Sequence, residues 1–351
     1  MKMKQTEGRD HTVDAFKGVL ILLVVIGHAT TGIVHELIYL FHMPLFFMVS
    51  GYLLKEESAL SRHYIASLAR RLLIPYFIYL SFDILVLQHH LSIKGCVEIL
   101  YGGRHAPGVY WYITCYMAAL VLFILIKNKL QRRHRIMLIA FLGIIATVES
   151  NLTERSHFLI KPGIPLNLDV ALMAVVYIAI GHECKKQINS LREKSIHDLP
   201  FTIGALVLIV VFAFIVYEQN VFHFSIDMKY VNYKECILSV LLPIAFGILI
   251  LRMICGMGWL VHSTVALFRD VSHFFYCLLA GLGQMSLAVM YWHLLVNHFQ
   301  LRFHYGALVY CLIGVTVPVV LCQLLGRSRA FQLALGFKAV DMKKLWNDTR
   351  S

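Results

Sequence analysis

Long apolar runs alternate with short polar segments along most of this chain. The apolar residues form ten runs, at 13–33, 37–54, 72–91, 110–127, 136–148, 167–184, 201–217, 236–255, 279–299 and 305–326. A helix needs about 20 residues to cross the hydrocarbon core of a bilayer, with a range of about 17–25, and most of the runs fit. The pattern predicts an all-α, polytopic membrane helix bundle of about ten transmembrane helices. An eleventh span remains open, because 259–278 is also fairly apolar.

Composition supports a membrane location. Hydrophobic residues make up 59% of the 351 positions and charged residues 15%, whereas a soluble domain carries about 45–50% and about 25%. No single soluble core can bury that much apolar surface. The eight cysteines include no Cys-x-x-Cys pair, so the sequence predicts neither a disulfide framework nor a metal site.

The basic residues indicate the orientation. If ten spans start from a cytoplasmic N-terminus, 25 of the 32 Lys and Arg residues lie on the cytoplasmic side, as the positive-inside rule requires. Both termini are then cytoplasmic, with a transmembrane domain over 1–326 and a short basic tail over 327–351. The formal net charge of +12 is therefore a topology signal, and we expect no nucleic-acid partner.

The first run, "KGVLILLVVIGH", carries Lys17 and His28 at its two ends. Eleven residues of α-helix make three turns plus about 20°, so both side chains lie on one face, roughly 16 Å apart along the axis. Lys17 can extend to the cytoplasmic surface. His28 lies deep in the span, where an ionisable side chain usually faces the bundle interior or a cavity. A histidine that only bonds a neighbouring carbonyl or hydroxyl is the structural alternative.

The second run is the stretch "YLFHMPLFFMVSGYLLKEE" over 39–57. Pro44 lacks an N–H and should kink this helix, leaving the Leu40 carbonyl without its helical partner. His42, Ser50 and Tyr52 are polar candidates on the same helix. Because only a short loop joins the first two runs, we expect the kink to stand beside His28.

The two stretches together resemble the membrane-bound acyltransferase-3 family, whose pattern is Arg or Lys, ten residues, then His. "DAFKGVLILLVVIGHA" and "FHMPLFFMVSGYLLK" carry the resemblance, and it continues over residues 10–326 in "RRLLIPYF", "VYWYIT", "YIAIGHECKK" and "GQMSLAVMYWHLLV". One departure concerns the spaced pair of arginines that the family often shows before its third helix. Ser67 and Leu68 occupy the positions that would pair with Arg70 and Arg71.

The resemblance implies an integral-membrane O-acetyltransferase of the bacterial cytoplasmic (inner) membrane. Its acyl donor would be cytoplasmic acetyl-CoA, and its acceptor a cell-surface or lipid-linked sugar. His28 would act as base or as acylated nucleophile, since a neutral imidazole suits proton transfer near pH 7. Lys17, Arg70 and Arg71 would hold the CoA phosphates, for which guanidinium groups are well suited.

Further candidates are weighed against structural roles. Asp83, Trp111 and His293 lie in or next to apolar runs. Trp111 could belong to an interfacial aromatic belt, His42 could be structural, and Arg70 and Arg71 could be topology residues only. Four residues near the expected outer surface could touch a sugar acceptor: His35, Glu36, Glu149 and Asp169.

Two other functions stay open at this point. A secondary transporter or exporter would use the Lys17–His28 face as a proton relay, although no inverted repeat of the kind common in transporters is visible. A purely structural membrane partner is the third possibility, and the Phe-His-Met-Pro string argues against it.

Overall fold

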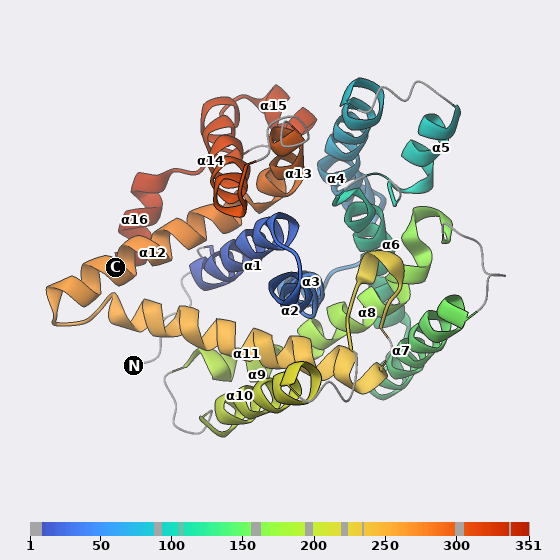
Figure 1. The fold of residues 1–351 in the computed structure, drawn as a ribbon, viewed down its shortest axis with the longest axis horizontal. Coiled ribbons are helices and arrows are strands. Elements are labelled where there is room, and N and C mark those ends of the chain that lie inside the picture. Colours follow the sequence, from blue (N-terminus) through green and yellow to red (C-terminus); the bar gives the residue numbers. More distant parts are fainter. Residues whose placement is uncertain are drawn as a thin grey trace.

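The computed structural model describes residues 9–87, 93–104, 106, 108–155, 163–193, 199–218, 224–233, 235–298, 305–336 and 338–350. Over these ranges the chain forms helices and turns, with one isolated β-bridge and no strand. Figure 1 shows α1 (His11–Ala29) near the centre of the bundle, with α2 (Ile33–Tyr39) and α3 (His42–Leu53) beside it. The predicted all-α architecture is confirmed.

The other helices surround this centre. In chain order they are α4 (Arg62–Phe82), η1 (Asp83–Leu87), α5 (Ile93–Tyr101), α6 (Tyr110–Lys129), α7 (Arg132–Arg155), η2 (Pro165–Asn167), α8 (Leu168–Glu183), α9 (Lys185–Arg192), α10 (Leu199–Ala213), η4 (Phe214–Glu218), η5 (Met228–Tyr230), α11 (Cys236–Leu260), α12 (Ala266–Gln284), α13 (Ser286–Val296), α14 (Ala307–Leu325), α15 (Arg329–Leu335) and α16 (Met342–Arg350).

The helices of the described residues account for nine spans by length and composition, and for ten if the bent pair α12 and α13 counts as one. Several helices expose large apolar side chains outward, as a lipid-facing surface should. The exposed apolar residues include Phe141 and Ile144 on α7, Leu206, Val207 and Val210 on α10, and Leu312 and Val320 on α14. The chain is a multi-pass membrane protein.

The ninth apolar run, 279–299, does not form the single helix that the sequence predicted. The chain forms α12 over 266–284, breaks at Met285, and continues as α13 at an angle of 80°. The expected run 279–299 therefore starts in the middle of α12, and the stretch 259–278 makes no eleventh span of its own. Hydropathy did not predict the bend, because the apolar character of a run does not indicate where a helix changes direction.

The kink expected from Pro44 is present. The helix is interrupted at Leu40 and Phe41, directly before α3, since Pro44 cannot donate to the carbonyl four residues earlier. The His42 ring supports the break, with Nδ1 2.7 Å from the carbonyl oxygen of Ile38. The interruption turns side chains of α2 and α3 toward α1.

Glycines allow two pairs of helices to meet backbone to backbone. A Cβ on Gly51 of α3 would lie 1.8 Å from the carbonyl oxygen of Ile178 in α8, and a Cβ on Gly181 would lie 1.8 Å from that of Met48. Gly18 of α1 and Gly283 of α12 form a second such crossing. Small residues of this kind commonly permit close helix packing in membranes, and here they fix α1 and α3 inside the bundle.

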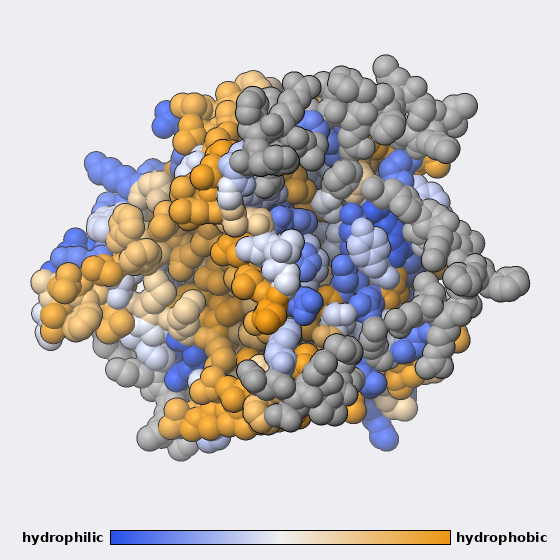
Figure 2. Space-filling model, viewed as in Figure 1, coloured by the Kyte–Doolittle hydropathy of each residue, from blue (hydrophilic) through white to orange (hydrophobic). Residues whose placement is uncertain are grey.

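The polar segments separate into two ends. At one end Arg192 forms an ion pair with Asp10, and His11 lies 3.9 Å from Asp348, so the two described chain ends are neighbours. At the other end lie the α5–α6 connection and the segment before α11. Figure 2 shows hydrophilic residues right of centre, where that segment lies in Figure 1, and hydrophobic residues over much of the left and lower parts.

Candidate functional site

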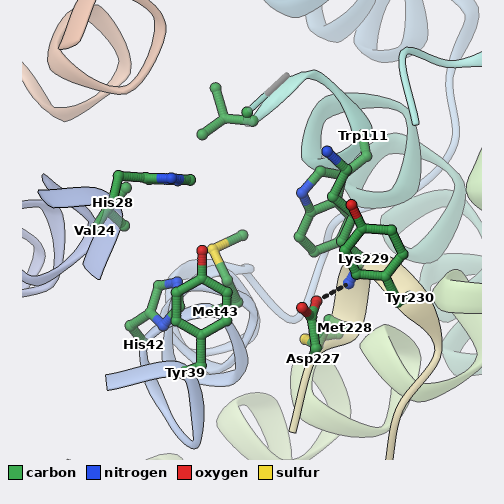
Figure 3. Close-up of a pocket in the computed structure, with 12 residues that line it drawn as sticks. Val24, His28, Tyr39, His42, Met43, Trp111, Asp227, Met228, Lys229 and Tyr230 are labelled. Atoms are coloured by element: carbon green, nitrogen blue, oxygen red, sulfur yellow. Dashed lines mark hydrogen bonds between the residues drawn. The ribbon is translucent and has the colours of Figure 1, made fainter. Parts of the chain in front are cut away.

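A cavity of about 170 Å³ lies between α1, the α2–α3 break, the start of α6 and the segment before α11. Its lining comprises Val24, His28, Tyr39, His42, Met43, Gly108, Val109, Trp111, Asp227, Met228, Lys229 and Tyr230. Figure 3 shows the side chains of α1, α2 and α3 facing those of α6 and the segment before α11. Ligand pockets usually measure about 300–1,000 Å³, so this cavity has room for reacting groups rather than for a whole cofactor.

Three histidines and a tyrosine form a ring cluster at this cavity. The His28 ring centroid lies 5.2 Å from that of His293 and 6.4 Å from that of Tyr39. Tyr39 in turn lies 4.9 Å from His42. The structure therefore brings together His28, His42 and Trp111, three of the predicted site residues, and places His293 directly behind His28.

Hydrogen bonds define how two of these histidines carry their protons. Nδ1 of His42 lies 2.7 Å from the Ile38 carbonyl, and Nδ1 of His293 lies 2.9 Å from the Val289 carbonyl. A carbonyl oxygen only accepts, so both Nδ1 atoms carry a proton and each neutral ring keeps a lone pair on Nε2. Nε2 of His293 is buried and has no hydrogen-bond partner among the described residues. Each ring therefore presents its Nε2 atom as a hydrogen-bond acceptor.

The segment before α11 supplies the opposite wall, and sequence reasoning missed it. Asp227, Lys229 and Tyr230 line the cavity together with Tyr39. Burial raises the pKa of Asp227 above its usual range and lowers the pKa of Lys229 below its own. No motif marks these residues. The only signal in the sequence was that a carboxylate and a lysine, Asp227 and Lys229, lie two positions apart in a segment expected on the outer side. The sequence analysis used the charge of Lys229 only to predict topology.

None of the predicted donor-binding cations lines the cavity. Nζ of Lys17 donates to the Asp14 carboxylate at 3.0 Å, and Asp14 is also paired with Arg9. Arg70 and Arg71 are exposed on α4. Their roles in binding CoA phosphates stay a prediction, with the qualification that Lys17 shares its charge with a neighbouring carboxylate.

A polar route runs from Arg71 toward the cavity. The charge of Arg71 interacts with the buried hydroxyl of Tyr116, which interacts in turn with Ser50. Ser50 also interacts with Tyr112, next in the chain to Trp111. These side chains come from α3, α4 and α6 and link the end that bears Arg71 to the cavity wall.

Two predicted residues take structural places. The Tyr52 hydroxyl donates to Asn189 at 2.7 Å and accepts from Arg192 at 2.7 Å, at the end of the bundle that holds the termini. Asp83 is buried, and its carboxylate interacts with the Tyr110 hydroxyl at the start of α6. Asp83 therefore has a partner on another helix.

The four expected acceptor contacts differ in their surroundings. His35 stacks on Tyr39 at 3.9 Å and lies 2.8 Å from the Gly27 carbonyl. Asp169 is buried and forms an ion pair with Arg104. Glu36 is exposed, and Glu149 is half-buried. None of the four lines the cavity.

Comparison with known proteins gives a family for this chain. A family model described as "Acyltransferase domain" matches residues 10–327. The nodulation protein NolL of Sinorhizobium fredii is 30% identical over 131 residues, which cover 32% of this chain and 36% of that protein. NolL of Mesorhizobium japonicum is 31% identical over 140 residues, covering 35% and 36%.

These alignments cover little more than a third of either relative, and no solved structure matches the chain. The family model, in contrast, matches nearly the whole chain and includes every segment that contributes to the cavity. The chain belongs to the acyltransferase-3 family and is a multi-pass membrane protein.

Proposed function

We propose that the protein is an integral-membrane O-acetyltransferase of the bacterial inner membrane. It moves an acetyl group from cytoplasmic acetyl-CoA to a hydroxyl of a cell-surface or lipid-linked sugar. The observation that carries this proposal is the cavity, where His28 and His42 from the family-like stretches face Trp111 and a carboxylate from the other wall. The family supplies acyl transfer, and the cavity supplies groups suited to activating a hydroxyl.

The reaction needs a base and a departing thiolate. His28 accepts the proton of the sugar hydroxyl while the oxygen attacks the thioester carbonyl carbon. The carbon–sulfur bond then breaks, and the CoA thiolate leaves with the proton returned by the imidazolium. In the second route His28 attacks the thioester first and passes the acetyl group on to the sugar. Both routes end in an O-acetyl ester and CoA.

The donor would approach from the end that holds Lys17, Arg70 and Arg71. These cations would bind the phosphates of CoA, while the pantetheine arm reaches along the side chains between Arg71 and Trp111. The helical distance of roughly 16 Å between Lys17 and His28 separates anchoring of charge from chemistry. Family membership favours this function over a secondary transporter that uses the same Lys–His face.

The test is a transfer assay with purified protein in lipid nanodiscs. Radiolabelled acetyl-CoA is incubated with methyl glycosides and with lipid-linked glycans extracted from bacterial membranes, and O-acetyl esters are detected by their alkali-labile label. We expect label on a saccharide and release of CoA that depends on the saccharide. CoA release at the same rate without any saccharide, and no labelled glycan, would contradict the proposal.

A further inference from the structure

The segment 224–233, called the lip here, is folded as a closed turn at the cavity. Asp227 and Asn232 exchange two backbone hydrogen bonds, of 3.0 and 2.9 Å, around the short helix η5. Val231 closes this turn with φ 55° and ψ 44°. A β-branched residue rarely adopts this left-handed conformation. Strain of this kind persists where the surroundings enforce it, which occurs often at ligand sites.

Contacts from distant segments hold the lip in place. Nε of Arg104, in the α5–α6 connection, donates to the Lys229 carbonyl at 2.9 Å. The same guanidinium forms a buried ion pair with Asp169 of α8. Nζ of Lys229 donates to the Ala106 carbonyl at 3.0 Å. The lip is thereby fixed against the bundle from both its backbone and its side chains.

The side chains of the lip suit a carbohydrate. Asp227 accepts a bond from the Lys229 N–H at 3.0 Å and also interacts with the backbone N–H of Tyr230, and a carboxylate with about four lone-pair sites has further capacity to accept from hydroxyl groups. Tyr230 is 67% exposed and Trp111 faces the same space. Aromatic rings with a polar atom pack against the apolar face of a sugar and bond its hydroxyls.

The charges of the cavity lining favour an uncharged acceptor. Among the described residues that line the cavity, Asp227 is the one carboxylate and Lys229 the one ammonium group, and the Lys229 ammonium donates to the Ala106 carbonyl. Because Lys229 already balances the charge of Asp227, a carboxylated sugar at the lip would add a negative charge that no other cation among the described lining residues offsets. Like charges brought together in a partly buried site cost several kcal/mol.

We propose that the lip is the acceptor subsite, in which Asp227 accepts hydrogen bonds from hydroxyls of an uncharged sugar while Trp111 and Tyr230 contact its ring. This inference rests on the proposed acetyl transfer to a saccharide and adds which sugars are selected and by which residues. Asp227 acts in binding and specificity, and His28 remains the group that acts on the reacting hydroxyl.

The variant Asp227→Asn tests the subsite with little change in structure, because asparagine caps a helix as well as aspartate. The matched control is Asp341→Asn, which alters an exposed carboxylate that accepts from the Lys344 N–H at 2.9 Å, before α16. Each protein is assayed with methyl glucoside, methyl galactoside, methyl mannoside and methyl glucuronide. The readouts are KM for each glycoside, kcat, and the Kd of acetyl-CoA.

We expect wild type to prefer the neutral glycosides over the glucuronide. Asp227→Asn should raise KM for the neutral glycosides about tenfold, as expected for losing a hydrogen bond to a charged group. It should also reduce the preference for the neutral glycosides over the glucuronide, and it should leave the Kd of acetyl-CoA unchanged. Asp341→Asn should behave as wild type.

The failures are distinguishable. Transfer by wild type with an unchanged KM and preference in Asp227→Asn overturns the subsite and leaves the proposed function standing. A wild-type protein that acetylates lipid-linked glycans but no glycoside in the panel overturns the subsite alone, and one that acetylates neither overturns both. An equal rise in KM in Asp341→Asn would show a general effect of losing a carboxylate and would also overturn the subsite.

Discussion

The two ends of α1 carry one predicted site residue each, and they are built differently. At one end, Lys17 is held by Asp14, three residues earlier on the same helix, and its side chain is 20% exposed. At the other end, His28 meets Tyr39 of α2 and His293 of α13 and lines a cavity closed by the lip. The Lys17 side chain is held by a local contact, whereas the His28 side chain meets a residue more than 200 positions away in the chain.

In the proposed reaction, this difference would separate two tasks. A cation that binds a flexible, charged donor must be accessible from water, but its position need not be fixed accurately. Groups that move a proton must be held within a fraction of an ångström by surrounding residues. In the proposed reaction, the end with His28 would carry the chemistry and the end with Lys17 would bind the donor. Five predictions test this comparison, beginning with the largest effect.

The first prediction concerns which end of the bundle faces the cytoplasm. Its expected effect, labelling or no labelling in intact cells, is all-or-none. Tyr230→Cys, in the exposed lip, should react with a membrane-impermeant maleimide in intact cells. Lys186→Cys, exposed at the opposite end, should react only after the membrane is permeabilised. The reason is the excess of Lys and Arg at the Lys186 end. Labelling of the wild-type cysteines is the background control, and the reversed pattern would place the cavity on the cytoplasmic side.

The second prediction concerns the chemistry at His28. His28→Gln keeps a hydrogen-bonding side chain but cannot take up a proton, so acetyl transfer should fall by about 10²–10⁴-fold. The Kd of acetyl-CoA should stay within a few-fold of wild type, because the donor is anchored at the other end. A well-folded His28→Gln protein with activity within a few-fold of wild type would make His28 a structural histidine.

The third prediction compares one ion pair from each end. Arg104→Met leaves Asp169 buried without its cation, which typically costs about 3–5 kcal/mol of stability. Lys17→Met should cost less, about 1 kcal/mol, since Asp14 keeps Arg9. The free energies of unfolding can be compared through denaturant titrations in the same detergent. Equal losses would show that the two ends do not differ in their dependence on tertiary contacts.

The sequence predicted the histidines and the tryptophan of the cavity but not the lip that faces them. His28, His42 and Trp111 occur in stretches with a recognisable pattern, and helical geometry placed Lys17 and His28 on one face. The position of the lip depends on Arg104 and on a strained turn. Those contacts join segments far apart in the chain, and no local periodicity encodes them.

The fold shows the same limit. Ten apolar runs predicted the helices well, since burial in lipid demands about 20 apolar residues whatever the neighbours are. The break at Met285, between α12 and the helix that carries His293, lies inside the run 279–299 that hydropathy predicted as one helix. Hydropathy reports that a segment is in the membrane and does not report its direction. Pro44 was the exception, because a proline changes the backbone by itself.

The fourth prediction addresses the donor end. Arg70→Ala with Arg71→Ala should raise the Kd of acetyl-CoA about tenfold, as expected for charged hydrogen bonds, and the effect should shrink as salt is added. The single variant Arg71→Ala should account for most of it, since Arg71 interacts with Tyr116 whereas Arg70 contacts the Ala66 carbonyl of its own helix. An unchanged Kd in the double variant would leave both as topology residues.

The last prediction returns to Asp227, where the effects on stability and on binding have opposite signs. Burial raises the pKa of Asp227 above its usual range, despite the opposing charges of Lys229 in the lip and of His35 in α2. Its folded pKa therefore exceeds its unfolded pKa. The contribution of this group to stability is fully present below the unfolded pKa and is lost as pH rises through the folded pKa. At neutral pH the charged side chain thus lowers the stability of the fold. Asp227→Asn should therefore raise the free energy of unfolding by about 1 kcal/mol or less, and with it Tm.

The affinity for the acceptor should change with pH in the opposite direction, because protonation of Asp227 removes the charge that accepts from sugar hydroxyls. KM for a neutral glycoside should rise as pH falls toward this raised pKa, while Asp227→Asn shows a weaker dependence. Parallel thermal unfolding and KM measurements across pH decide the matter: a lower Tm for Asp227→Asn at neutral pH would make Asp227 a structural residue of the turn.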